Sequence, residues 1–331
     1  LIIIYGGLTH TTTNGTTTFT AGTFGWTFGA TSGTYNISPP AAGYTYDWPW
    51  TLGPNASTAI WKLQNNLTLG STRVLTFNNG TIDGNNYTIS GASSLTMATG
   101  TFSLTNSSGT SFSISAIPII HQSGTLTLGT NVSSTGAAGY TFTAGTINLS
   151  SYALSVYLFS SSNVNTRTLN FGTGKIVLTA TTNATVWNTA TLTGLTISGT
   201  PLVECQGGGA GTKTINTGAM TEAQAISFSI LETHNSNIIT YSVGTSVFKN
   251  LRIVGPSGGG TTVFSFTGNT IYGGFTDTPG AGTTTISTST SAWTFGATSG
   301  SYSINPNPST TYDFPWTFGS ASSTATWTLG A

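Results

Sequence analysis

Seven acidic side chains are the groups of this sequence that could hydrolyse a sugar polymer. Such hydrolysis needs two carboxyl groups roughly 5 to 10 Å apart. Glu204, Glu222 and Glu232 are near enough in sequence to fall on adjacent strands, whereas isolated acids more often hold turns. The complete set is Asp47, Asp83, Glu204, Glu222, Glu232, Asp277 and Asp313. We expect no catalytic residues and no enzyme, with a polysaccharide hydrolase or lyase as the alternative.

Other patterns that could hold a ligand are incomplete. His10, His121 and His234 are far apart and lack the spacing of metal ligands. Asp83-Gly84-Asn85-Asn86 lacks the further acids of a calcium loop and indicates a turn. Residues 169–176 have Leu in place of the first Gly of a phosphate-binding loop and Ile in place of its Ser or Thr. The sequence therefore predicts no metal and no cofactor.

Composition excludes several classes of protein. Only 4% of residues are charged, and the formal net charge is zero. The Lys and Arg residues are scattered singly, without the basic patch that binds nucleic acid. No apolar run approaches the roughly 20 residues that span a membrane. With 37% hydrophobic residues the chain is expected to fold, without nucleic-acid partners and without a membrane span.

An internal repeat organises the chain. Residues 26–33 read Trp-Thr-Phe-Gly-Ala-Thr-Ser-Gly, and residues 293–300 read the same. Tyr5 recurs as Tyr272, a step of 272 − 5 = 267 residues. A fixed period is typical of arrays and solenoids, so we expect the chain to be part of a longer array. The predicted parts are an aromatic-rich β module at 1–64, a Thr-, Ser- and Gly-rich β-solenoid at 65–267, and a second copy of the module at 268–331.

Aromatic residues of the repeated module could stack on sugar rings. The segment 46–50, Tyr-Asp-Trp-Pro-Trp, recurs at 312–316 as Tyr-Asp-Phe-Pro-Trp. Strand alternation places its three rings on one face. Phe in place of Trp favours packing within or between modules over binding of sugars, because a core accepts either ring. The candidates for either role are Trp26, Tyr46, Trp48, Trp50, Trp293, Tyr312, Phe314 and Trp316.

Residue types and their alternation predict an all-β fold. Thr, Val, Ile and aromatic residues suit strands, while good helix formers are scarce. Short runs such as Val74–Phe77 and Leu126–Leu128 carry apolar side chains at alternate positions and are separated by Gly, Asn and Ser turns. We predict a β-solenoid resembling a parallel β-helix, with tandem β-sandwich modules as the alternative. Thr221–Ile226 is the best candidate for a helix.

Several segments between residues 150 and 275 support a resemblance in combination. They are Arg167–Gly174, Ala184–Thr189, Leu192–Ile197, and Val247–Leu251 leading to Ile271–Gly274. Together they resemble uncharacterised β-solenoid repeat proteins of the phage tail-fibre-like and bacterial adhesin-like type from aquatic environments. Lys175-Ile176 departs from that pattern. The resemblance implies a fibre or surface protein and brings no catalytic site.

These observations predict a structural role. We expect a non-enzymatic repeat protein that forms the shaft or repeating unit of an extracellular, cell-surface or virion-surface fibre or filament, with adhesion as a further role. Its expected partner is itself, by head-to-tail or lateral assembly, and surface glycans are a second class of partner. The alternative is a carbohydrate-binding or polysaccharide-cleaving tailspike or adhesin. That alternative requires an open groove lined by Trp or Tyr.

Overall fold

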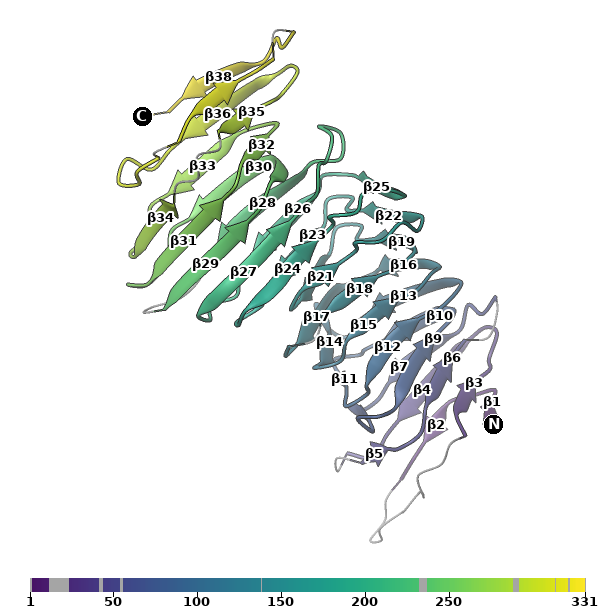
Figure 1. The fold of residues 1–331 in the computed structure, drawn as a ribbon. Coiled ribbons are helices and arrows are strands. Elements are labelled where there is room, and N and C mark those ends of the chain that lie inside the picture. The colour runs from purple at the N-terminus through teal and green to yellow at the C-terminus, as the bar shows by residue number, and fades with distance from the viewer. Residues whose placement is uncertain are drawn as a thin grey trace. The chain divides into compact units, whose positions relative to one another are not determined.

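Every regular element of the protein is a β-strand in the part of the chain that the structure describes (Figure 1). This computed structural model describes residues 2–11, 24–41, 44–53, 56–137, 139–231, 237–287, 292–312, 314–320 and 322–330. The strands form parallel sheets of a β-solenoid, which confirms the predicted fold class. Two compact units comprise residues 1–157 with 165–174, and residues 158–164 with 175–331.

Unit 1 contains three parallel sheets, and each full turn of the chain, here called a coil, adds one strand to a sheet. The first has β1 (Ile2–Ile4), β3 (Trp26–Phe28), β6 (Trp50–Leu52), β9 (Val74–Phe77), β12 (Ser94–Met97), β15 (Ile119–His121) and β18 (Tyr140–Phe142). The second has β2 (Leu8–Thr9), β4 (Thr34–Ser38), β7 (Ile60–Leu63), β10 (Gly80–Asp83), β13 (Thr101–Thr105), β16 (Thr125–Leu128), β19 (Gly145–Asn148) and β22 (Arg167–Asn170). The third has β5 (Thr45–Tyr46), β8 (Leu67–Leu69), β11 (Thr88–Ser90), β14 (Ser111–Ser115), β17 (Asn131–Thr135) and β20 (Ala153–Val156).

Unit 2 is also built of parallel strands. One sheet has β21 (Phe159–Ser160), β24 (Ala184–Asn188), β27 (Gly211–Asn216), β29 (Ile238–Val243), β31 (Thr261–Phe266) and β34 (Thr283–Ser287). The other sheet begins with β23 (Lys175–Leu178), β26 (Leu202–Cys205), β28 (Ile226–Leu231) and β30 (Ser246–Val254). A further strand of this unit, β25 (Leu195–Ser198), is not part of these two sheets. The long β30 then pairs with two strands, β32 (Asn269–Ile271) and β33 (Phe275–Thr278). β32 continues to β35 (Trp293–Phe295) and β37 (Trp316–Phe318), and β33 to β36 (Ser301–Asn305) and β38 (Thr326–Leu329).

Side chains in register stack into columns that form the core of each unit. Alternate residues of a strand point to opposite faces, so every second side chain lies over its partner in the next coil. One column of unit 1 contains Ile4, Phe28, Leu52, Phe77, Met97, His121 and Phe142. All of these side chains except Ile4 are buried. The column explains why slim and aromatic apolar residues recur throughout the sequence.

Turns between strands form at Asn and Gly residues. In Asp83–Asn86 the two asparagines have φ values of 47° and 66°, and Tyr87 N donates to Gly84 O at 2.7 Å. Asn tolerates this left-handed region better than most residues. The Asp83 carboxylate accepts from the backbone N–H of Ser107 at 2.8 Å, which ties this turn to the next coil. The segment is a turn, as its sequence indicates.

The expected helix at Thr221–Ile226 is wrong. Thr221–Gln224 forms a turn closed by a bond from Gln224 N to Thr221 O at 3.0 Å, and Ile226 already begins β28. The Gln224 side chain also accepts from Thr221 N at 3.2 Å. Helix nucleation is unfavourable in so short a segment, and the strand that follows adds ladder bonds instead.

The two copies of the repeated module have equivalent strands and equivalent pairing. β1, β3 and β6 correspond to β32, β35 and β37, while β2, β4 and β7 correspond to β33, β36 and β38. Trp26 pairs with Trp50 as Trp293 pairs with Trp316. Side-chain bonds recur as well: Ser57 Oγ donates to Ala30 O, and its equivalent Ser323 Oγ donates to Ala297 O. The same sequence pattern therefore produces the same local structure in both units.

The repeat supplies a matched test of coil spacing. Gly53 and Gly319 are equivalent and have φ values of 71° and 66°, a region that costs other residues about 1–2 kcal/mol. A Cβ on Gly53 would overlap the Asn79 backbone of the next coil, whereas on Gly319 its nearest neighbour would be Ser323 Cβ at 3.2 Å. We expect G319A to lose about 1–2 kcal/mol of stability and G53A about 1–3 kcal/mol more. Amide hydrogen exchange around each glycine measures these local losses, and equal losses would contradict close stacking at Gly53.

Candidate functional site

The first group of predicted aromatic residues forms a packed cluster in unit 1. Tyr46, Trp48 and Trp50 are all buried, but alternation along one strand, as the sequence predicted, is not the reason. β5 ends at Tyr46, β6 begins at Trp50, and the chain bends at Trp48 between these two strands. Trp26, from the neighbouring coil, is partly exposed, and its ring lies 4.8 Å from that of Trp48 and 6.0 Å from that of Trp50. Tyr46 and Trp50 meet edge to face at 5.2 Å. These rings pack on one another, and three of the four are buried.

The second group forms the equivalent cluster in unit 2 and is less covered. Trp293 is buried, whereas Tyr312, Phe314 and Trp316 are partly exposed. The rings of Trp293 and Phe314 are 4.8 Å apart, as are those of their equivalents Trp26 and Trp48. The difference in exposure arises because β9 pairs with β6, while no described strand pairs with the outer edge of β37.

One polar contact differs between the two clusters. Tyr46 Oη lies 3.2 Å from His10 Nδ1, whereas the equivalent Tyr312 Oη donates to Asp277 Oδ2 at 2.5 Å. His10 and Asp277 are equivalent in the repeat (277 − 10 = 267). Burial raises the pKa of Asp277 above its ordinary value and raises the pKa of both tyrosines. The repeated cluster therefore keeps a polar partner for its tyrosine while changing that partner's charge.

The acids occupy separate structural positions. Asp47 bonds Arg73 Nε at 2.7 Å, and this hydrogen bond lowers the pKa of Asp47. Asp83 lies 3.8 Å from Lys62 Nζ, and Glu204 lies 2.9 Å from Lys175 Nζ. Each of these pairs joins neighbouring coils.

The remaining acids and histidines form no metal cluster in the described part of the chain. No group of three His, Cys, Asp or Glu side chains gathers there. His121 Nε2 lies 3.3 Å from Gly124 O and its Nδ1 lies 3.1 Å from Tyr140 Oη. Because a carbonyl only accepts, Nε2 carries the proton and Nδ1 accepts from the tyrosine, which describes a neutral imidazole. Glu232, His234 and Asp313 lie outside the described residues.

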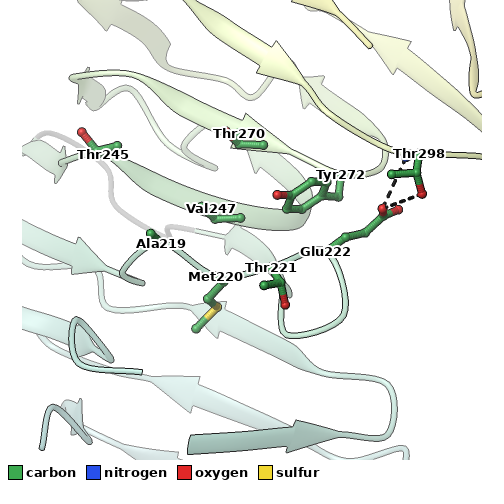
Figure 2. Close-up of a pocket in the computed structure, with 9 residues that line it drawn as sticks. All are labelled: Ala219, Met220, Thr221, Glu222, Thr245, Val247, Thr270, Tyr272 and Thr298. Atoms are coloured by element: carbon green, nitrogen blue, oxygen red, sulfur yellow. Dashed lines mark hydrogen bonds between the residues drawn. The ribbon is translucent and has the colours of Figure 1, made fainter. Parts of the chain in front are cut away.

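A hollow in unit 2 collects polar residues that sequence reasoning did not bring together. It has a volume of about 580 Å³ (Figure 2). Its lining is Ala219, Met220, Thr221, Glu222, Thr245, Val247, Thr270, Tyr272 and Thr298. Glu222 Oε2 accepts from the Thr298 hydroxyl at 2.9 Å and from the Thr298 backbone N–H at 3.3 Å. The sequence singled out Glu222 as one of three nearby acids, Thr221 at the start of a candidate helix, and Tyr272 and Thr298 through the internal repeat, but no sequence signal brought these residues together.

Comparison with known proteins finds no matching family model, no matching curated protein and no matching solved structure. The described residues also contain no helix long and apolar enough to cross a membrane.

Proposed function

We propose that this protein is a non-enzymatic structural repeat unit that forms the shaft or repeating segment of a fibre on the outside of a cell or virion. The observation that supports this is the pair of equivalent modules with equivalent strand register, one in each unit. Similar end modules suit a head-to-tail contact, and such a contact gives a filament when it does not close.

The last described coil of the second copy leaves its apolar columns uncovered. Phe318 and Leu329 are 44% and 65% exposed, whereas the equivalent Leu52 and Leu63 are each 1% exposed. In the first copy, β9 and β10 cover these positions. No described strand pairs with the outer edges of β37 and β38. An exposed strand edge with apolar side chains is a site where another strand can add.

The first coil of the first copy presents the opposite edge. β30 covers β32 and β33 in the second copy, but no described strand covers the equivalent edges of β1 and β2. Ile2 lies in register with Trp26 and is 50% exposed. Leu8 lies in register with Ile37 and is partly exposed. No described strand therefore covers the apolar columns at this edge either.

The two edges match in register. Joining β37 to β1 and β38 to β2 of a second copy would extend both sheets in parallel. Trp316 would then lie over Ile2, and Leu329 over Leu8, as successive coils do within the chain. With zero formal net charge, the copies have little long-range repulsion to overcome.

Sedimentation velocity across a concentration series tests the proposal. We expect the wild-type chain to form a series of oligomers, and L329D to weaken association at least about 100-fold, because the contact would bury an unpaired carboxylate. Val164 is 68% exposed and lies between β21 and β22, which pair with β24 and β19 and belong to neither edge. V164D is therefore the matched control and should assemble like the wild type.

Mixing variants distinguishes a head-to-tail contact from a lateral one. L329D keeps the β1–β2 edge, and I2D keeps the β37–β38 edge. We expect each variant alone to be monomeric and an equimolar mixture to stop at dimers. A wild-type chain that stays monomeric at all concentrations overturns the proposed function, whereas unchanged assembly of both variants overturns this contact.

A further inference from the structure

The hollow in unit 2 has two walls of different origin. One wall is the outward face of neighbouring coils, where Val247 of β30 pairs in register with Thr270 of β32. The adjacent inward residues Phe248 and Ile271 are buried in the core, so the alternate side chains face the hollow. The other wall is the segment 219–222 that precedes β28. Figure 2 shows these residues around the hollow, with Glu222 reaching toward Thr298.

Glu222 is fixed in position and keeps acceptor capacity. Its Oε2 holds both hydrogen bonds from Thr298, which is 76 residues away in sequence. Within the described residues, Oε1 of the same carboxylate has no hydrogen-bond partner. The carboxylate is therefore oriented by one oxygen while the other can accept from a ligand.

The first copy of the module shows what is particular to this hollow. Tyr5 and Thr31 are the equivalents of Tyr272 and Thr298, each 267 residues earlier. Ile3 is the equivalent of Thr270 and is 48% exposed. The module alone thus supplies the ring and one hydroxyl. The second copy adds the hydroxyl of Thr270, and the segment 219–222, outside the module, completes the hollow.

The chemistry of the lining selects a class of ligand. One carboxylate is too few for a calcium site, which takes six to eight oxygen ligands. A negative charge with no Lys or Arg in the lining disfavours anions. What remains is an aromatic ring, four threonine hydroxyls and a carboxylate acceptor in a space within the range of about 300–1,000 Å³ typical of small-molecule sites.

We propose that this hollow binds a neutral saccharide unit. The apolar face of the sugar ring packs on Tyr272, a sugar hydroxyl donates to Glu222 Oε1, and the hydroxyls of Thr245 and Thr270 bond further sugar oxygens. The hydroxyls of Thr221 and Thr298 already donate to Gln224 and Glu222 and can only accept. The site is independent of the edges that would join copies, so it can exist whether or not the chain forms a fibre.

Saturation-transfer NMR with glucose, galactose, mannose and N-acetylglucosamine, and their short oligosaccharides, as probes tests the proposal on the full chain. We expect transfer to at least one probe, with affinity about tenfold weaker in Y272A. Y5A removes the same side chain from the first copy and is the matched control, with unchanged affinity expected. E222Q keeps an oxygen for Thr298, so it should fold like the wild type and bind more weakly.

Three outcomes would overturn the site. They are no transfer to any probe, equal affinity in Y272A and wild type, and equal losses in Y272A and Y5A. Circular dichroism of each variant confirms that the affinities compare folded proteins.

Discussion

Trp50→Ala is expected to lower the free energy of unfolding around the first aromatic cluster by about 3–5 kcal/mol. The Trp50 side chain is fully buried, and its ring centroid lies 4.9 Å from that of Phe28 and 5.2 Å from that of Tyr46. Its indole N–H has no hydrogen-bond partner among the described residues. The loss therefore reports packing, because the substitution leaves a cavity that the paired backbones cannot close.

Amide hydrogen exchange followed by mass spectrometry measures this loss locally. A local method suits a stack of coils, which need not unfold as one cooperative unit. Trp316→Ala is the matched control, since it removes the equivalent ring from the edge of the second copy, where Trp316 is partly exposed. A smaller loss is expected there. Equal losses in the two variants would contradict the difference in burial between the copies.

Acidification should destabilise unit 1 through His121. Burial lowers the pKa of His121 to about 4 from its ordinary 6.5. Above pH 6.5 the imidazole is neutral in both folded and unfolded chains. As the pH falls from 6.5 toward 4, the unfolded chain takes up a proton that the folded one excludes. The free energy of unfolding therefore decreases as the pH is lowered, by about 3 kcal/mol over the whole range.

H121F isolates this contribution. Phenylalanine suits the column between Met97 and Phe142, although it leaves Tyr140 without the imidazole acceptor and lowers stability at every pH. The measurement is the slope, between pH 7 and 4, of the free energy of the urea transition in which unit 1 unfolds. Asp277, whose pKa is raised, acts in the opposite direction but is present in both proteins. Identical slopes would show that His121 is not held neutral.

The fold class could be predicted from the sequence because apolar and polar side chains alternate along the strands. Val74–Phe77 and Leu126–Leu128 have alternating apolar residues, and both segments are strands. The number of residues in each coil could not be predicted from the sequence. Val74 pairs with Ser94 after 20 residues, whereas Ala184 pairs with Lys213 after 29. Turns absorb this variation, so the spacing of hydrophobic runs does not fix which strands become neighbours.

The candidate site was predictable only in part. Tyr46, Trp48 and Trp50 lie in one short segment, so the proximity of their rings could be predicted, whereas the bend between β5 and β6 that brings them together could not. Glu222 and Thr298 meet only because several coils return the chain to the same face. No local pattern reports a contact across 76 residues. The acids Glu204 and Glu222 looked like neighbours in sequence, yet Glu204 bonds Lys175 and Glu222 bonds Thr298.

The matching register of the two modules bears on how the number of repeats can change in evolution. Inside the module, a strand that returns after one period pairs with the equivalent strand, as Trp293 pairs with Trp316 where Trp26 pairs with Trp50. Duplication or loss of one whole period in the gene would therefore leave every column in phase. Residues 26–33 and 293–300 are identical and mark equivalent points of the two copies. Length could then change between descendants in whole steps, without any new contact having to evolve.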